Sequence, residues 1–93
     1  MINGRYSVRL VARNEGIQYV DDVDIYRFKV SRDGEVWTLY VPGSKEPDYE
    51  VHDLDDEEKE RILPRVVHYL ERTKYFAFLR SKYSVEIIYT RKI

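Results

Sequence analysis

A short acidic run holds the residues whose types first suggest chemistry. His52 and Asp53 are followed by Asp55, Asp56 and Glu57, and carboxylates beside an imidazole can hold a divalent cation. The same carboxylates stand where the first turn of a helix would begin, and acidic residues there stabilise the helix dipole. A calcium loop of the EF-hand type does not fit either, because position 64, where its glutamate would stand, is a proline. The sequence therefore predicts no metal site here.

Basic side chains follow the acidic run at helical spacing. At about 100° per residue, Arg61, Arg65, His68 and Arg72 fall in one narrow stripe of a helix, almost opposite its apolar stripe. We therefore expect an exposed cationic ridge that could bind an anion or nucleic acid. Acidic neighbours partly neutralise this stripe, so a solvated helix face is the alternative interpretation.

A second group of basic residues lies on the predicted strands. Alternation places their side chains on the sheet face that points away from the helix, with one aromatic residue interleaved. This set contains Arg9, Arg13, Arg27, Lys29, Thr38 and Tyr40. A basic sheet face with aromatic residues is typical of proteins that bind single-stranded nucleic acid. Any solvated antiparallel face looks similar, and this one lacks an aromatic pair for stacking.

Sequence signatures of catalysis are missing. The chain has no glycine-rich dinucleotide or Walker loop, no Gly-x-Ser-x-Gly turn and no cysteine. His68 would be exposed in the middle of the helix, and a general base without a paired carboxylate would be unusual. The sequence therefore predicts a protein that is not an enzyme and holds no cofactor.

The aromatic content points to protein contacts. Nine tyrosines and one tryptophan are many for a core of 93 residues, and both types are enriched at interfaces. The last predicted strand is apolar on both faces, which suits a strand covered on both sides. A second copy of the chain could supply one cover; a central position in the sheet, or residues 42–54, could supply it instead. The interface candidates are Val85, Ile88, Tyr89 and Tyr40.

Strands are predicted in the first half of the chain. Residues 5–13 alternate cleanly, and a second extended run covers 19–31, with a bulge or bend near Asp24 to restore its register. Asp33-Gly34 predicts a tight hairpin turn into a third strand over 36–41, which Pro42-Gly43 would end. Residues 42–54 then form a long connection, part of which could pair or pack through Tyr49, Val51 and Leu54.

One helix and a final strand are predicted in the second half. The helix spans about 55–72, with an apolar stripe of Leu63, Val66, Val67 and Leu70, and Pro64 would kink or split it. Residues 74–79 fit a helix or a strand, and 84–90 form a strand. Grouped strands before a helix indicate an α+β fold, an antiparallel meander with the helix on one face. The last strand would pair most simply beside the first.

Length and charge set the class of protein. A chain of 93 residues with 43% hydrophobic residues is one folded domain, 1–93. The net charge of −1 combines a strongly acidic segment, 45–60, with a basic segment, 61–93. With no cysteine and no long apolar run, the sequence indicates a cytoplasmic protein without a membrane segment. We expect a small binding module that contacts an unidentified protein partner and forms a homodimer; nucleic-acid binding is the alternative.

Overall fold

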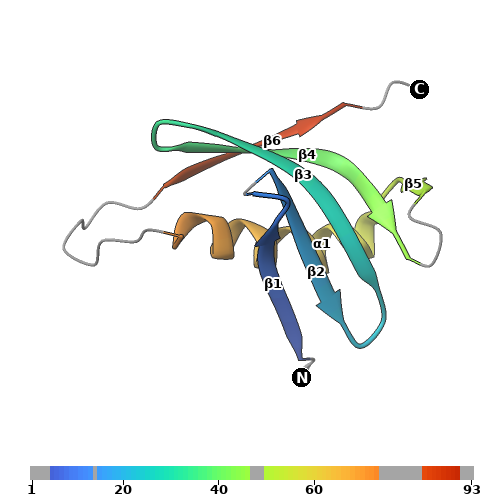
Figure 1. The fold of residues 1–93 in the computed structure, drawn as a ribbon. Helices are drawn as coiled ribbons and strands as arrows, with labels where there is room; N and C mark the ends of the chain where they lie inside the picture. Colours follow the sequence, from blue (N-terminus) through green and yellow to red (C-terminus); the bar gives the residue numbers. More distant parts are fainter. Residues whose placement is uncertain (1–4, 14, 47–49, 74–82, 91–93) are drawn as a thin grey trace.

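The computed structural model describes residues 5–13, 15–46, 50–73 and 83–90, and these form one sheet and one helix (Figure 1). The elements are β1 (Tyr6–Val11), β2 (Gly16–Asp21), β3 (Ile25–Asp33), β4 (Val36–Lys45), β5 (Glu50–His52), α1 (Asp56–Glu71) and β6 (Ser84–Tyr89). β1 to β5 pair antiparallel in sequence order, and β6 pairs parallel with β4. The predicted α+β class is confirmed. No helix of the described residues is long and apolar enough to cross a membrane.

The second extended run, predicted as one strand over 19–31, is two strands joined by a tight turn. A carboxylate oxygen of Asp21 accepts the backbone N–H groups of Val23 at 2.8 Å and Asp24 at 2.7 Å. This side chain thus replaces the backbone acceptor that would continue a strand, so the chain reverses at the polar residues. The predicted bend near Asp24 is therefore a hairpin turn. This part of the sheet contains one more strand than the predicted meander.

The third strand is also longer than predicted. β4 continues past Pro42, after a cis Val41–Pro42 peptide, and ends at Lys45. Gly43 allows this, because a Cβ atom there would lie 2.4 Å from the carbonyl oxygen of Arg27 and 2.7 Å from the Phe28 ring. β3 thus approaches β4 too closely for any side chain at this position. The register between the two strands shifts at this same place.

The last strand does not lie beside the first. β6 runs parallel to β4, from Val36↔Ser84 to Val41↔Tyr89, while β5 pairs with the far end of the same β4 edge. A parallel neighbour requires a crossover connection, and α1 lies within it. The sequence contains no signal for this choice, because the apolar pattern of β6 fits either edge of the sheet.

The Asp33-Gly34 turn is confirmed. Asp33 pairs with Val36, so Gly34 and Glu35 form a two-residue loop between β3 and β4. Gly34 has φ +63°, in the left-handed region that side chains disfavour.

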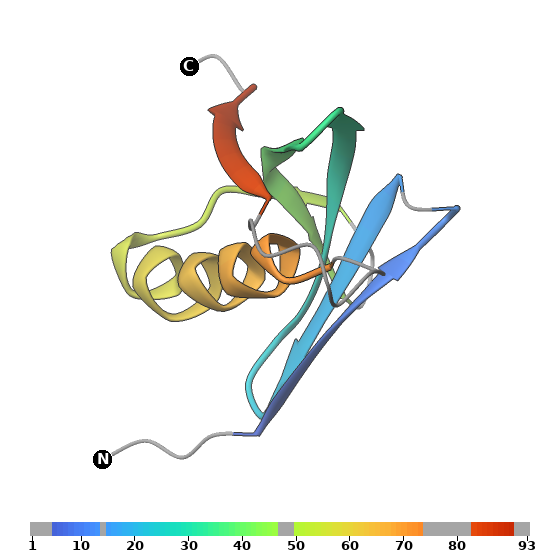
Figure 2. The ribbon, with the colours of Figure 1, turned by 90° about the vertical axis from the view of Figure 1, so that its left-hand side faces the viewer.

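The core lies between α1 and the face of the sheet that we call the inner face (Figure 2). The predicted inward residues of the strands are buried, and Val8 and Leu10 pack against them. The buried sheet residues include Ile17, Tyr19, Tyr26, Phe28, Val30, Trp37, Leu39 and Val41, and the helix adds Ile62, Leu63, Val66 and Leu70.

Three predictions about the second half have different outcomes. α1 is one continuous helix with Pro64 exposed within it, so the proline does not split the helix. Part of the connection pairs as β5 and Leu54 is buried, as predicted, whereas Val51 is exposed. Tyr49 and the ambiguous segment 74–79 lie outside the described residues.

Candidate functional site

The predicted interface residues divide between the two faces of β6. Alternation places Ile88 beside Tyr40 on the outer face of the sheet, the face away from α1. Val85 and Tyr89 lie on the inner face, opposite Trp37 and Val41 of β4. The structure therefore brings two of the four candidates together and separates them from the other two.

The two faces of β6 have different surroundings. Val85 and Ile87 pack against the core from the inner face. Ile88 is 43% exposed and Tyr89 is 56% exposed, with the ammonium of Lys59 5.4 Å from the Tyr89 ring centroid. Among the described residues, no strand pairs with the edge of β6 that faces away from β4. β6 is thus an edge strand with an exposed isoleucine beside its open edge.

The predicted basic sheet face forms in part. Arg9, Arg27 and Lys29 are exposed on the outer face, and the register aligns Arg9 with Gln18 and Gln18 with Arg27 across three strands. Lys29 aligns with Tyr40. The prediction that Arg13 belongs to this face is wrong, because Arg13 follows the end of β1 in a turn, with φ 56°. The described outer face therefore holds one cross-strand row of two arginines and a separate lysine.

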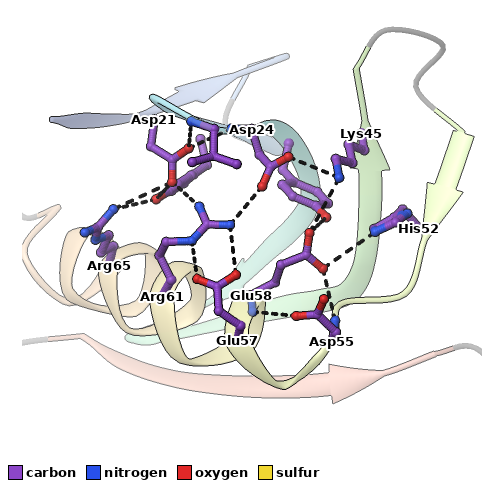
Figure 3. A network of polar contacts seen from close by, with 12 residues as sticks. Asp21, Asp24, Lys45, His52, Asp55, Glu57, Glu58, Arg61 and Arg65 are labelled. Carbon is purple, nitrogen blue, oxygen red and sulfur yellow. Dashed lines mark hydrogen bonds and ion pairs between the residues drawn. The ribbon is translucent and has the colours of Figure 1, made fainter. Parts of the chain in front are cut away.

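The predicted cationic ridge on the helix is wrong at its N-terminal end. Arg61 forms ion pairs with Asp21, with Asp24 at 2.8 Å and with Glu57 at 2.7 Å, and its side chain is only 16% exposed (Figure 3). Arg65 donates to the Tyr19 hydroxyl at 2.7 Å. These two arginines fasten α1 to the turn between β2 and β3.

The reason is the orientation of the helix. Ile62 and Glu58 are buried together with Leu63, Val66 and Leu70, whereas Val67 is only half-buried. At about 100° per residue, the two additional buried residues rotate the buried face toward the basic stripe. The stripe therefore lies on a flank of α1 that the curved sheet reaches, and only His68 and Arg72 remain exposed.

A second set of contacts continues this polar cluster toward β4 and β5. Buried Glu58 accepts a hydrogen bond from the Tyr26 hydroxyl at 2.7 Å. Its carboxylate also lies 3.6 Å from both Lys45 and His52 (Figure 3). Lys45 pairs in addition with Asp24 at 3.1 Å. No buried side-chain nitrogen or oxygen of the described residues lacks a hydrogen-bond partner. The cluster is thus internally satisfied, and it joins the helix to four strands, β2 to β5.

Burial and charge shift the pKa values within this cluster. Burial and the hydrogen bond to Asp21 raise the pKa of Tyr19 to about 12. Burial opposes ionisation of Asp21, but hydrogen bonds from Tyr19 and two backbone N–H groups, with the charge of Arg61, hold its pKa below the usual value. A hydrogen bond to Asp24 raises the pKa of Lys45. Asp21 and Lys45 therefore stay charged, and Tyr19 stays neutral, at physiological pH.

The acidic run beside His52 does not gather into a metal site. No group of three or more metal-ligating side chains is found within the described part of the chain. Asp55 instead caps α1, accepting the Glu58 N–H at 2.8 Å, while the Glu58 side chain accepts the Asp55 N–H at 3.0 Å. This reciprocal capping box is the role that the sequence assigned to the acidic residues.

A groove lies between β1 and the C-terminal half of α1. Its volume is about 530 Å³. Val8, Leu10 and Tyr69 line it together with Arg65, His68 and Arg72. The sequence does not predict this groove, because β1 and the C-terminal half of α1 are far apart in the chain and no sequence pattern indicates that they meet.

The strand partners of the helix in this polar cluster were also missed. Asp21 ends β2, Asp24 lies in the β2–β3 turn and Lys45 ends β4, and only the folded sheet brings them to the helix. The one available signal was the opposite charge of the turn and of the helix stripe.

Comparison with known proteins identifies no relative of this chain, since no family model, curated protein or solved structure matches it significantly.

Proposed function

We propose that this protein is a small, non-catalytic binding module that acts through protein–protein contact and self-associates through the edge of β6. The observation that supports this most directly is the open edge of β6, with Ile88 43% exposed beside it. An edge strand presents unpaired N–H and C=O groups, which are a template for another strand. The cysteine-free composition fits a cytoplasmic setting.

A second copy of the chain is the partner that we propose. Two copies of β6 can pair antiparallel about a two-fold axis, so that each strand satisfies the edge of the other. If the axis is perpendicular to the sheet, Ile88 and Tyr40 of both copies form one apolar patch on a continuous outer face.

The test is the molar mass in solution, measured by light scattering over a range of protein concentrations. The wild type is expected to be a dimer and Ile88→Lys a folded monomer, because a charge at the two-fold interface faces its own copy. Val23→Lys is the matched control, since Val23 is 73% exposed in the distant β2–β3 turn. It should remain a dimer.

Two results would overturn self-association through β6. One is a wild type that stays monomeric at several hundred micromolar, and the other is an equal loss of mass in Val23→Lys. If Ile88→Lys does not fold, Ile88→Thr keeps a β-branched side chain and should weaken the dimer while preserving the strand.

Nucleic-acid binding by the outer face remains a second candidate, because the register brings Arg9 and Arg27 into one row near Lys29. The double substitution of Arg9 and Arg27 by alanine should weaken binding and flatten its salt dependence, since fewer counterions are released. Replacing His68 and Arg72 by alanine tests the helix in the same way. A wild type without salt-dependent binding at low ionic strength would exclude both surfaces.

A further inference from the structure

We propose that the groove between β1 and the C-terminal half of α1 binds a small organic anion, with a phosphate or carboxylate head on an apolar body. The groove has two chemically different walls. Val8, Leu10 and the Tyr69 ring supply an apolar side, and Arg65, His68 and Arg72 supply a basic side. None of the described residues that line the groove is acidic. Its volume, about 530 Å³, lies in the range of small-molecule sites.

The basic wall has an unneutralised end. Arg65 is partly satisfied, because it bonds to Tyr19 and lies 3.7 Å from the carboxylate of Asp21. Arg72 forms no ion pair with a carboxylate of the described residues, and its Nε donates to the imidazole of His68 at 3.1 Å. A guanidinium that, among the described residues, hydrogen-bonds to an imidazole and pairs with no carboxylate can bind an anion without first breaking a salt bridge.

The spacing of the two side chains suits one anionic head. His68 and Arg72 are four residues apart and therefore neighbours on the same face of α1. An oxyanion between them would accept charge-assisted hydrogen bonds from the guanidinium and from the imidazole N–H, which are stronger than neutral ones. The head then lies at the helical wall and the apolar body extends toward Val8 and Leu10.

The aromatic residues of the groove favour a small ligand over a nucleic-acid strand. The Tyr6 ring already stacks on Tyr19, with centroids 6.1 Å apart, and has the guanidinium of Arg65 4.4 Å from its centroid. The Tyr69 hydroxyl accepts the backbone N–H of Leu10 at 3.3 Å. Strand binding relies on free ring faces for successive bases. The apolar contacts on offer here suit one ring or a short chain.

The experiment is a titration followed by amide chemical shifts of the full chain, with four probes. Phenyl phosphate and benzoate carry both head and body, inorganic phosphate carries the head alone, and benzyl alcohol carries the body alone. At least one of the first two should bind more than about tenfold tighter than either partial probe. The largest shifts should fall on residues of the groove, Leu10 and Tyr69 among them. The order of phenyl phosphate and benzoate identifies the preferred head.

Variants then locate the site. Arg72→Gln should weaken binding of the tighter probe by about tenfold, which corresponds to one lost charge-assisted contact. Arg9→Gln removes the same charge from the outer face and should leave the affinity unchanged. His68→Gln should also weaken binding, and it replaces Arg72→Gln if that variant does not fold.

Several outcomes would overturn the proposal. These are equal weakening by Arg72→Gln and Arg9→Gln, shifts concentrated away from the groove, and partial probes that bind as tightly as complete ones. The proposal is also overturned if neither phenyl phosphate nor benzoate binds at 10 mM, a concentration at roughly the weakest useful affinity. None of these results depends on whether β6 forms a dimer, so the two proposals fail independently.

Discussion

The two halves of α1 carry the same kind of basic side chain and use it differently. In the N-terminal half, Arg61 is held by three carboxylates and its side chain is mostly buried. At the C-terminal end, the capping residue Arg72 is exposed, and within the described part of the chain its side chain hydrogen-bonds to His68 alone. Both residues belong to one stripe at regular helical spacing, so the helix itself does not account for the difference.

The sheet accounts for it. The β2–β3 turn places Asp21 and Asp24 against the first half of the helix, whereas β1 presents Val8 and Leu10 to the second half. A basic residue opposite two buried carboxylates forms ion pairs that stabilise the fold. The same type of residue opposite apolar side chains forms no such pair, so its charge can still bind a ligand. Helical spacing thus fixes which side chains share a face, and the opposing strand determines which contacts they make.

The largest effect is expected for Arg61→Ala. This change removes the guanidinium that pairs with both Asp21 and Asp24, whose side chains are 4% and 6% exposed. Asp24 keeps Lys45 at 3.1 Å and Asp21 keeps Arg65 at 3.7 Å. Removing one partner of a buried ion pair costs about 3–5 kcal/mol of unfolding free energy. Chemical denaturation measures this loss. Arg61→Lys should recover only part of it, because one ammonium cannot bridge both carboxylates as the planar guanidinium does.

A loss below about 1 kcal/mol in Arg61→Ala, the size ascribed to exposed pairs, would contradict the division between the two halves. It would mean that water screens the cluster and that the N-terminal arginine is no more structural than the C-terminal one.

The next effect is expected for Tyr19→Phe. The Tyr19 hydroxyl donates to Asp21 at 2.5 Å and accepts from Arg65 at 2.7 Å, so it links the turn to the helix. Removing a hydrogen bond to a charged group costs about 1.5–3 kcal/mol. Denaturation at neutral pH measures the change. Tyr40→Phe is the control, since the Tyr40 hydroxyl shares an exposed hydrogen bond with Ser31 and is not part of the cluster.

The same variant should change the response to alkali. The pKa of Tyr19 is about 12 in the folded protein, against about 10 in an unfolded chain. A raised pKa contributes stability that is complete below pH 10 and is lost as the pH rises toward 12. The wild type should therefore lose more stability across this window than Tyr19→Phe does. Equal slopes would place the hydroxyl in water rather than in the cluster.

The parts of the fold that sequence predicts are those encoded locally. Alternation identified Phe28, Val30 and Leu39 as inward residues, and the Asp33-Gly34 pair identified the hairpin with its positive φ. These signals depend on the two-residue period of a strand and on the freedom of one glycine. Neither requires knowledge of what lies across the sheet.

The parts that sequence missed are long-range. Asp21 ends a strand because its carboxylate accepts two backbone N–H groups, yet in the sequence it is one aspartate of an apparently extended run. β6 joins the edge of β4, and its apolar pattern fits the opposite edge equally well. The candidate site was predicted least well, because the contacts of Arg61 and Arg72 depend on strands that are far from them in the sequence.

A smaller effect is expected for Asp55→Ala at the N-terminal cap. Loss of the hydrogen bond to the Glu58 N–H should cost about 1 kcal/mol, and Asp55→Asn should retain most of the stability. Denaturation midpoints measure both. Asp56→Ala is the control, since it removes an exposed first-turn charge without removing the cap. An equal loss in Asp56→Ala would assign the effect to the helix dipole instead of the capping box.

The smallest effect on stability is expected for Arg72→Ala. The side chain is exposed at the end of α1 and pairs with no carboxylate of the described residues, so the unfolding free energy should change by less than about 0.5 kcal/mol.

The proposed anion site predicts a second, larger difference between the wild type and Arg72→Ala. A ligand that binds only the folded state stabilises it by an amount that grows with its concentration over Kd. Phenyl phosphate or benzoate should therefore raise the melting temperature of the wild type and leave that of Arg72→Ala nearly unchanged. If Arg72→Ala instead destabilises the protein as strongly as Arg61→Ala, both halves of the helix are structural and the basic end of the groove is not available to a ligand.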